Sequence, residues 1–158
     1  MPKTTSYGVL IFNEQHQLLV AHVTGKHVWD IPKGGAESGE APIEAAVRET
    51  FEETGVVLNP GDLQDLGLHP YLPAKDLHLF YTAVTRTDLD IASCRCTSFF
   101  AHHRTGKPTP EVDAFRWIPQ DAIASHCSPR MAALLLSLLA NGTAIPAATG
   151  GRLRREAP

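Results

Sequence analysis

Short apolar runs separated by polar turns mark much of this chain. Residues 7–12 (YGVLIF) and residues 18–23 (LLVAHV) are apolar, and the segment between them is polar. Two such runs joined by a short polar turn predict a β-hairpin. Three later stretches are also typical of strands, the last with alternating apolar and polar positions: residues 63–71, 77–85 and 112–118.

One stretch has helical spacing instead. Between Pro42 and Gly55, residues recur at helical spacing to form one mostly apolar face, which is predicted to be buried: Ile43, Val47, Thr50, Phe51 and Thr54. A proline suits the first turn of a helix, and a glycine suits its C-terminal cap. The segment therefore predicts an amphipathic helix with defined ends.

A second helix is predicted after Ser128, which is suited to capping its first turn. Its apolar stripe, which we expect to pack in the core, consists of Met131, Leu134, Leu135 and Leu138. Residues 87–110 follow no clear period. Strands, helix, strands and helix in this order indicate an α/β (α+β) fold with one mixed sheet.

The first helix carries a cluster of acids. Glu49, Glu52 and Glu53 lie three and four positions apart, so they share one side of the helix, which we expect to lie opposite Phe51. Dense carboxylate oxygens are suited to hard divalent cations such as Mg²⁺ or Mn²⁺. The alternative is a solvated acidic face in which Arg48 pairs with Glu52.

The spacing around these acids extends over residues 34–56. Gly34, Glu40, Arg48-Glu49, Glu52-Glu53 and Gly55-Val56 stand at the intervals of Gly-x5-Glu-x7-Arg-Glu-U-x-Glu-Glu-x-Gly-U, where U is a bulky aliphatic residue. This stretch resembles the signature box of the Nudix hydrolase family. Eight of the nine defining positions match, and the departure is a threonine at residue 50.

The resemblance implies a mixed β-sheet sandwiched between helices, and a hydrolase that cleaves a pyrophosphate bond in a nucleoside diphosphate linked to another moiety. It implies Mg²⁺ or Mn²⁺ as the cofactor. Arg48 would position the acids, Glu40 would fix the preceding loop, and Glu52 and Glu53 would be catalytic. The implied metal ligands are the carbonyl of Lys33 and the carboxylates of Glu49, Glu52 and Glu53.

A site that holds several hard cations needs more oxygen ligands than one helix offers. Family members commonly add an acid from a loop before a late strand, and here Glu111 stands just before residues 112–118. We expect Glu111 to reach the helical acids as a catalytic and metal-binding residue, with Asp113 as the alternative. We expect the side chain of Lys33 to contact a phosphate. Trp29 is either a stacking surface for a base or a core residue.

Length and charge limit the remaining possibilities. With 158 residues and a formal net charge of −3, we expect one domain over residues 1–142, a flexible tail over residues 143–158, and no broad electrostatic binding of nucleic acid. No apolar stretch is long enough for a membrane span. Three cysteines and no leader-like segment indicate a cytoplasmic protein with free thiols. A homodimer is possible.

Other readings remain beside the hydrolase. A nucleotide-sensing Nudix module would not need the metal acids, and nothing in the sequence favours an isomerase of prenyl diphosphates. Among hydrolase substrates, nucleoside triphosphates, dinucleoside polyphosphates, nucleotide sugars and RNA 5′ ends stay open. Cys94 and Cys96 with His102 and His103 lack the spacing of a zinc site.

Overall fold

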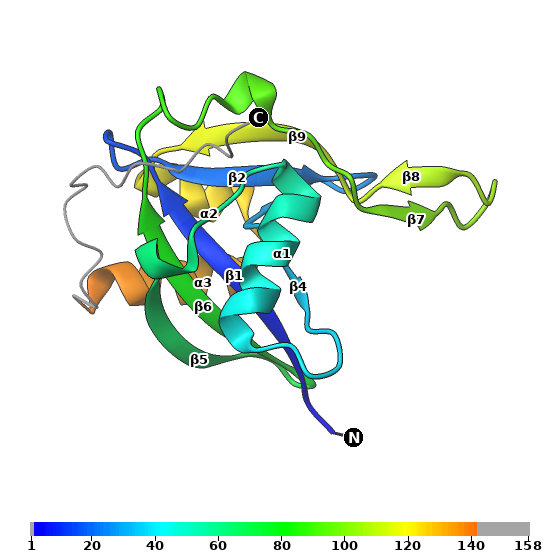
Figure 1. Ribbon diagram of the computed structural model, residues 1–158, viewed down its shortest axis with the longest axis horizontal. Helices are drawn as coiled ribbons and strands as arrows, with labels where there is room; N and C mark the ends of the chain where they lie inside the picture. The colour runs from blue at the N-terminus through cyan, green and yellow to red at the C-terminus, as the bar shows by residue number, and fades with distance from the viewer. Residues whose placement is uncertain (1, 142–158) are drawn as a thin grey trace.

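The structure is a computed structural model, and it describes residues 2–141. A seven-stranded mixed sheet forms its centre (Figure 1). The strands of this sheet are β1 (Thr4–Phe12), β2 (Leu18–Val23), β3 (Trp29–Asp30), β4 (Lys33–Gly35), β5 (Gln64–Leu72), β6 (Lys75–Ala83) and β9 (Val112–Ile118). The predicted hairpin and the three later strands are all present; the start of β1 is shifted by three residues and the other ends by at most two.

Strand β1 organises the sheet. It runs parallel to β6 along its whole length, from Thr4 opposite Lys75 to Phe12 opposite Ala83. On its other side, its first half pairs with β4, and its end meets β2 only at Phe12 opposite Leu18. β2 then diverges to pair with β3 and β9. This divergence leaves β4 and the start of β9 at the same side of the molecule.

Two helices cover opposite faces of the sheet, α1 (Pro42–Thr54) and α3 (Pro129–Ala140). The side chains of β1 alternate between the two cores, as a strand requires. Leu10 and Phe12 pack with the α3 side, whereas Val9 and Ile11 pack with the α1 side. The expected mixed sheet between helices is therefore confirmed.

The second predicted helix is also confirmed. The hydroxyl of Ser128 accepts a hydrogen bond from the N–H of Met131 (3.4 Å) and caps α3. Met131, Leu135 and Leu138 are buried, and Leu134 is partly buried. The expected end at Gly142 and the expected tail at residues 143–158 lie outside the described residues. Within residues 2–141, no helix has the length and apolar character that crossing a membrane requires.

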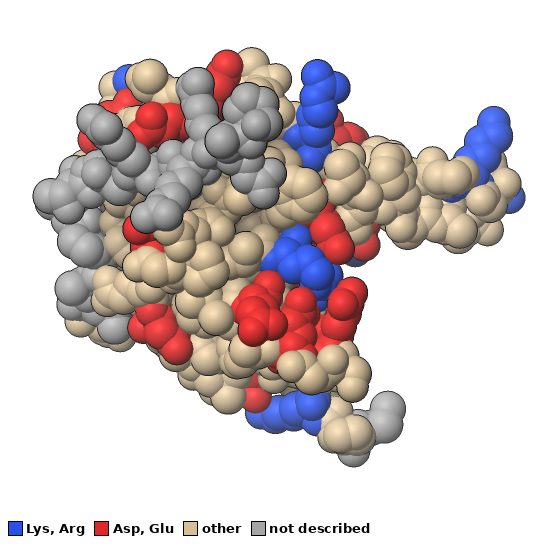
Figure 2. Space-filling model, viewed as in Figure 1, with Lys and Arg blue, Asp and Glu red and all other residues tan. Residues whose placement is uncertain are grey.

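A two-stranded sheet, β7 (Phe99–Ala101) and β8 (Pro108–Pro110), forms a hairpin that extends beyond the main body (Figure 1). The segment at residues 105–110, expected to be a loop, thus includes a strand. Lys and Arg side chains lie at the far end of this hairpin (Figure 2). Short helical turns complete the described structure: η1 (Pro60–Asp62), η2 (Ile91–Ser93), η3 (Gln120–Ala122) and α2 (Ile123–His126).

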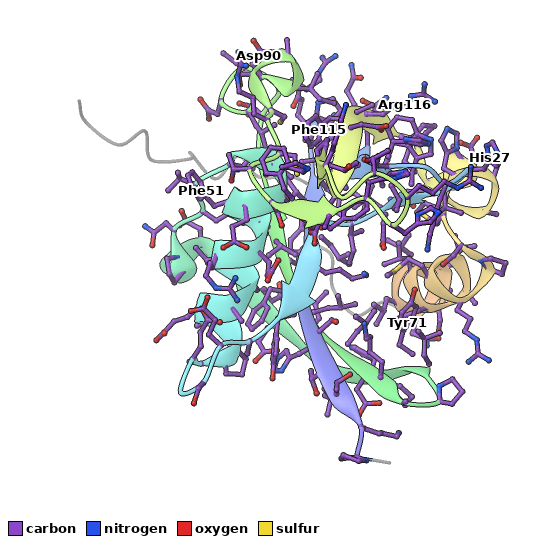
Figure 3. The ribbon with its side chains drawn as sticks, turned by 90° about the vertical axis from the view of Figure 1, so that its right-hand side faces the viewer. His27, Phe51, Tyr71, Asp90, Phe115 and Arg116 are labelled. Carbon is purple, nitrogen blue, oxygen red and sulfur yellow. The ribbon has the colours of Figure 1, made fainter. Side chains whose placement is uncertain are left out.

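The predicted buried face of α1 is wrong at Phe51. Its side chain is 46% exposed and lies on the outer side of the helix (Figure 3). The rest of the predicted face is confirmed, because Thr50 and Thr54 are buried and Ile43 and Val47 pack partly buried against the core. The other buried residues of α1 are Ala45, Ala46 and Glu53. Small side chains let α1 approach β1 and β4 closely, and a phenylalanine ring would hold it away. α1 is thus rotated towards its acids, which places Glu53 against the sheet.

Candidate active site

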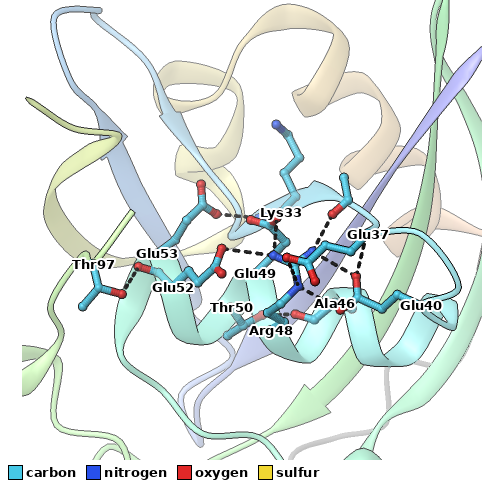
Figure 4. Close-up of polar contacts among 11 residues, drawn as sticks. Lys33, Glu37, Glu40, Ala46, Arg48, Glu49, Thr50, Glu52, Glu53 and Thr97 are labelled. Carbon is cyan, nitrogen blue, oxygen red and sulfur yellow. Dashed lines mark hydrogen bonds and ion pairs between the residues drawn. The ribbon is translucent and has the colours of Figure 1, made fainter. Parts of the chain in front are cut away.

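Arg48 connects both ends of the acid-bearing segment (Figure 4). Its guanidinium donates to both carboxylate oxygens of Glu40 (2.8 and 2.9 Å) and to the carbonyl of Gly35 (2.8 Å). One nitrogen also donates to Glu49 (3.0 Å) and Glu52 (3.1 Å). This hydrogen bonding raises the pKa of Arg48, chiefly through Glu40. Arg48 therefore fixes the β4–α1 loop and orients two of the acids.

Glu40 closes that loop. Besides Arg48, it accepts a hydrogen bond from the N–H of Glu37 (2.9 Å). The Arg48 hydrogen bonds and then this N–H lower the pKa of Glu40 to about 2. Glu40 thus has the loop-fixing contacts that were expected of it.

Gly34 makes room for Glu49. A Cβ atom at residue 34 would overlap the carboxylate of Glu49, so only glycine is compatible with this packing. Burial raises the pKa of Glu49, and the charge of Arg48 opposes that shift. β4 and α1 are therefore in contact at the point where the acid lies.

Glu53 is the most buried acid of the cluster, with 8% of its surface exposed. It accepts a hydrogen bond from the backbone N–H of Lys33 (2.7 Å). Burial raises its pKa to about 8, although that N–H and the charge of Lys33 lower it. A carboxylate so poorly solvated is stabilised in its charged form by a nearby cation.

The side chain of Lys33 forms an ion pair with Asp30 (3.1 Å). Burial opposes its charge, but the Asp30 carboxylate outweighs this effect, so the pKa of Lys33 is raised. Lys33 therefore remains a cation beside the acids.

A cavity of about 470 Å³ opens between these elements. Glu49, Glu53, Glu111 and Lys33 line it, whereas Arg48, Glu52 and Trp29 are not among its lining residues. Glu52 keeps 36% of its side chain exposed and is held by Arg48. The helical acids thus separate into two that face the cavity and one at its margin.

Glu111 comes to this cavity from the start of β9. Its N–H donates to the carbonyl of Ser98 (2.9 Å), and its carbonyl accepts from the N–H of Thr24 (3.1 Å). The negative charge of Glu111 contributes to the raised pKa of both Glu49 and Glu53. The fold therefore brings Glu111 to the helical acids, across more than fifty positions of sequence. Asp113, the alternative, instead contacts Nδ1 of His22 (2.6 Å).

Trp29 lies in a separate cluster. The guanidinium of Arg116 stands over its ring (4.6 Å from the centroid), and His22 contacts it edge-on (5.1 Å between centroids). The ring centroid of His126 lies 6.3 Å from that of Trp29, and its Nε2 is within hydrogen-bonding distance of the Arg116 guanidinium (3.2 Å). One face of the indole is therefore already covered by a cation.

Comparison with known proteins agrees with this geometry. The family description "NUDIX domain" matches residues 2–136. The chain belongs to the Nudix family. The family expected from residues 34–56 is thus confirmed, and it extends over nearly the whole described chain.

Two relatives illustrate the range of similarity to this Nudix protein. An uncharacterized 17.7 kDa protein of Enterobacteria phage T4 is 40% identical over 127 residues, which cover 75% of this chain and 83% of the relative. An RNA pyrophosphohydrolase of Marinomonas sp. (strain MWYL1) is 33% identical over 119 residues, covering 70% of this chain and 72% of the relative.

Solved structures share the Nudix fold at low identity. An Ap4A hydrolase binary complex from C. elegans has a TM-score of 0.57 and 18% identity, over 86% of this chain and 96% of that one. The NUDIX domain of Shewanella oneidensis NrtR, complexed with ADP ribose, has a TM-score of 0.64 and 11% identity. The match covers 89% of this chain and 88% of that one. At this level of identity the likeness establishes the fold alone.

Within residues 2–141, no three His, Cys, Asp or Glu side chains are grouped as a ready metal site. The cause lies in the contacts above, because Arg48 holds Glu49 and Glu52 while the Lys33 N–H holds Glu53. The residues still fit a divalent cation. Their donors are oxygens, and the glycine at residue 34 leaves space for the Glu49 carboxylate beside the cavity.

Several cavity residues of this Nudix protein have no local signal in the sequence. They are Ser6, Lys26, Lys75, Ser98 and Phe100. Ser6, Lys75, Ser98 and Phe100 stand well outside residues 34–56, and Lys26 precedes them by eight positions, so the fold is what brings these residues to the acids. Their position could not have been inferred from spacing along the chain.

Proposed function

We propose that this Nudix hydrolase cleaves a pyrophosphate bond in a nucleoside diphosphate linked to another group, and that it uses Mg²⁺ or Mn²⁺. The observation that carries the proposal is the juxtaposition of Glu49, Glu53 and Glu111 at one cavity. Burial, and then the charge of Glu111, raise the pKa of Glu49 and of Glu53, so these two carboxylates need positive charge nearby to remain ionised. A divalent cation bound between the carboxylates and the polyphosphate of the substrate would neutralise the negative charge of both.

The carboxylates of Glu49, Glu52, Glu53 and Glu111 and the carbonyl of Lys33 are the proposed metal ligands. A bound divalent cation would supply Lewis-acid stabilisation of the charge that develops on the phosphate oxygens. Arg48 would keep Glu49 and Glu52 in place through its existing hydrogen bonds. Removal of Arg48 would therefore loosen ligands on two sides of the cluster.

Proton transfer would fall to the buried acids. Glu53 is buried and lines the cavity, so once a bound cation keeps its carboxylate ionised it would be placed to accept a proton from an attacking water. Glu111 faces the same cavity and is the second candidate. Lys33, already placed beside Glu53, would stabilise a phosphate as a point charge.

The substrate class follows from charge and from relatives. The cavity is lined by cationic Lys26, Lys33 and Lys75, which suit a polyphosphate. The names of the relatives, an RNA pyrophosphohydrolase and an Ap4A hydrolase, support a nucleotide-type substrate.

Free thiols at Cys94, Cys96 and Cys127 are consistent with the expected cytoplasmic location.

A sensor function is the competing proposal, because a NUDIX domain of NrtR binds ADP ribose in a solved complex. A module that only binds nucleotide has no need of the full set of metal acids. Here Glu49, Glu52 and Glu53 are all present, and Glu111 joins them. The complete set favours hydrolysis.

A panel of substrates tests the proposal. ATP, Ap4A, ADP ribose and 5′-triphosphorylated RNA are each incubated with Mg²⁺, with Mn²⁺ and with excess EDTA, and the products are identified by mass spectrometry. We expect turnover of at least one substrate with metal and none with EDTA. Glu53→Gln serves as the inactive control. Full turnover in EDTA, or saturable binding with no turnover of any substrate, would contradict the proposal.

A further inference from the structure

The β7–β8 hairpin differs in charge from the rest of the chain. Residues 91–110 contain Arg95, Arg104 and Lys107 but no aspartate or glutamate. The whole chain, in contrast, has a formal net charge of −3. Figure 2 shows acidic side chains near the base of the hairpin and basic side chains at its far end. Residues 91–110 are therefore a basic region in a chain whose overall net charge is negative.

Unpaired cations gather at this hairpin and at the cavity. Elsewhere in residues 2–141 the basic side chains have partners, as Arg86 has Glu14 (2.6 Å) and Arg130 has the carbonyl of Tyr71 (3.3 Å). The basic side chains without a hydrogen-bond or ion-pair partner among residues 2–141 are Lys26, Lys75, Arg95, Arg104 and Lys107. The first two line the cavity, and the others belong to the acid-free segment.

The base of the hairpin is part of the active site. Ser98 and Phe100 line the cavity, and the carbonyl of Ser98 accepts from the N–H of Glu111 (2.9 Å). On the other side, the N–H and hydroxyl of Thr97 donate to the carbonyl of Glu52 (2.7 and 3.2 Å). The hairpin is thus anchored to both acid-bearing elements, and its direction is fixed relative to them.

The hairpin also presents aromatic surface to solvent. Phe99 is 56% exposed and Phe100 is 41% exposed. Beyond them, the imidazoles of His102 and His103 stack at 4.7 Å between centroids. Exposed rings interleaved with cations are the features that bind single-stranded nucleic acid, because bases stack on the rings and phosphates pair with the cations.

The turn itself is held in place. The N–H of His102 donates to the carbonyl of Lys107 (2.9 Å), and the N–H of Gly106 donates to the carbonyl of His102 (2.8 Å). At about 3.3 Å per strand residue, the turn lies roughly 10 Å beyond Phe100, which also lines the cavity. That distance exceeds a single nucleotide and is suited to a short stretch of stacked nucleotides, at about 3.4 Å each.

We propose that the β7–β8 hairpin is an arm that binds a single-stranded oligonucleotide whose 5′-polyphosphate lies in the cavity. The proposal rests on the proposed function, because the cavity must hold the scissile pyrophosphate bond. Phe100, on the cavity side of β7, and the stacked pair His102–His103 stack on bases that follow the first nucleotide, and Arg104 and Lys107 pair with their phosphates. A mononucleotide occupies the cavity but does not reach the turn.

Neutralisation of the turn tests this arm. Arg104→Gln with Lys107→Gln is compared with Arg86→Gln with Arg130→Gln, which removes the same charge from exposed positions elsewhere. For each protein, kcat/KM is measured with ATP and with a 5′-triphosphorylated RNA hexamer at several salt concentrations. Binding of a fluorescent 5′-triphosphorylated RNA hexamer is measured separately in EDTA, where no turnover is needed.

We expect the turn variant to lose roughly tenfold in kcat/KM for the hexamer at low salt, and none for ATP. Its salt slope should fall by about 1.4, for two phosphate contacts on a single strand. The control pair should behave as wild type with both substrates. If the turn variant lost equal kcat/KM with both substrates, or lost none with the hexamer, the proposed role of the hairpin would be contradicted.

The two proposals fail separately. If wild type hydrolyses nothing but binds the hexamer more tightly than the turn variant, the arm stands and the hydrolase proposal falls. If wild type hydrolyses ATP yet binds the hexamer no better than the turn variant, the arm falls. If the wild type sediments as a dimer that Phe99→Ser converts to monomer, the hairpin is an interface between copies, and the arm is overturned.

Discussion

The carboxylate of Glu49 occupies the space that a side chain at residue 34 would need. A Cβ atom there would overlap this carboxylate, yet nothing lies within 4 Å of a Cβ built at the neighbouring Gly35. The glycine is therefore required for the acid rather than for a backbone turn. This contact ties the strand before the helix to the helix itself.

Gly34→Ala should reduce activity more than stability. The methyl group displaces the end of a flexible side chain, so the melting temperature should change little, while Glu49 leaves its position at the cavity. We expect kcat to fall by about 100-fold or more, which corresponds to roughly 3 kcal/mol. Gly35→Ala is the matched control and should retain wild-type kcat. Equal activity of the two variants would show that the position of Glu49 is unimportant.

Glu53→Gln should abolish most of the turnover without unfolding the protein. Gln keeps the shape and can keep the contact with the Lys33 N–H, but it removes the negative charge. The loss of a ligand that stabilises transition-state charge is worth several kcal/mol, or roughly a thousandfold in kcat. Steady-state kinetics with saturating Mg²⁺ check this outcome, with circular dichroism as the control for folding. A variant that kept near wild-type kcat would remove Glu53 from the mechanism.

The same residue should make metal-free stability depend on pH. Burial raises the pKa of Glu53 from 4.5 to about 8, so between these values the folded protein holds a proton that the unfolded chain has released. The stability from protonated Glu53 is fully present below pH 4.5 and is lost as pH rises through about 8. Urea unfolding in EDTA should show wild type losing stability relative to Glu53→Gln over this window. A constant difference between them would contradict the raised pKa.

The sequence predicted the secondary structure wherever the apolar residues followed a single strand or helix period. The strands of the core alternate or run apolar, and α3 has a regular stripe, so burial alone decided their structure. The β7–β8 hairpin could not be predicted in the same way. β7 is exposed, and β8 is only partly buried and has a proline at each end, so no apolar period marks the hairpin. It is held by backbone hydrogen bonds from Thr97 to Glu52 and from Thr24 to Glu111, and each of these joins residues far apart in the sequence.

Phe51 shows the limit of periodicity within a correctly predicted helix. The helical period correctly placed Thr50 on the buried face, but it also placed Phe51 there, whereas the Phe51 ring is exposed and Glu53 is buried. The Thr50 hydroxyl donates to the carbonyl of Ala46 (2.8 Å), so this polar side chain is satisfied within the helix. The hydrogen bond from the Lys33 N–H to Glu53 joins residues far apart in the sequence, so no local period predicts it.

Phe51→Ala should therefore cost little stability. An exposed ring away from special contacts contributes within about 0.5 kcal/mol, whereas truncation of a buried leucine costs about 2–5 kcal/mol. Leu10→Ala, at a residue that is 1% exposed, is the comparison. Thermal or urea unfolding of both variants distinguishes the two sites. A loss at Phe51 as large as that at Leu10 would mean that this face of α1 is covered in solution.

Arg48 offers the sharpest test of how the acids are positioned. Its guanidinium reaches Glu40, Gly35, Glu49 and Glu52 at once, which a lysine cannot do because it has no planar fork. Arg48→Lys keeps the charge but should lower kcat by about 100-fold, with a smaller change in KM, because Glu49 and Glu52 lose their orientation.

Glu40→Gln should act through the same guanidinium. In a double-mutant cycle the two losses should therefore be less than additive, with a coupling of about 1–2 kcal/mol. Strict additivity would mean that Glu40 does not act through Arg48, and wild-type kcat in Arg48→Lys would mean that charge alone positions the acids.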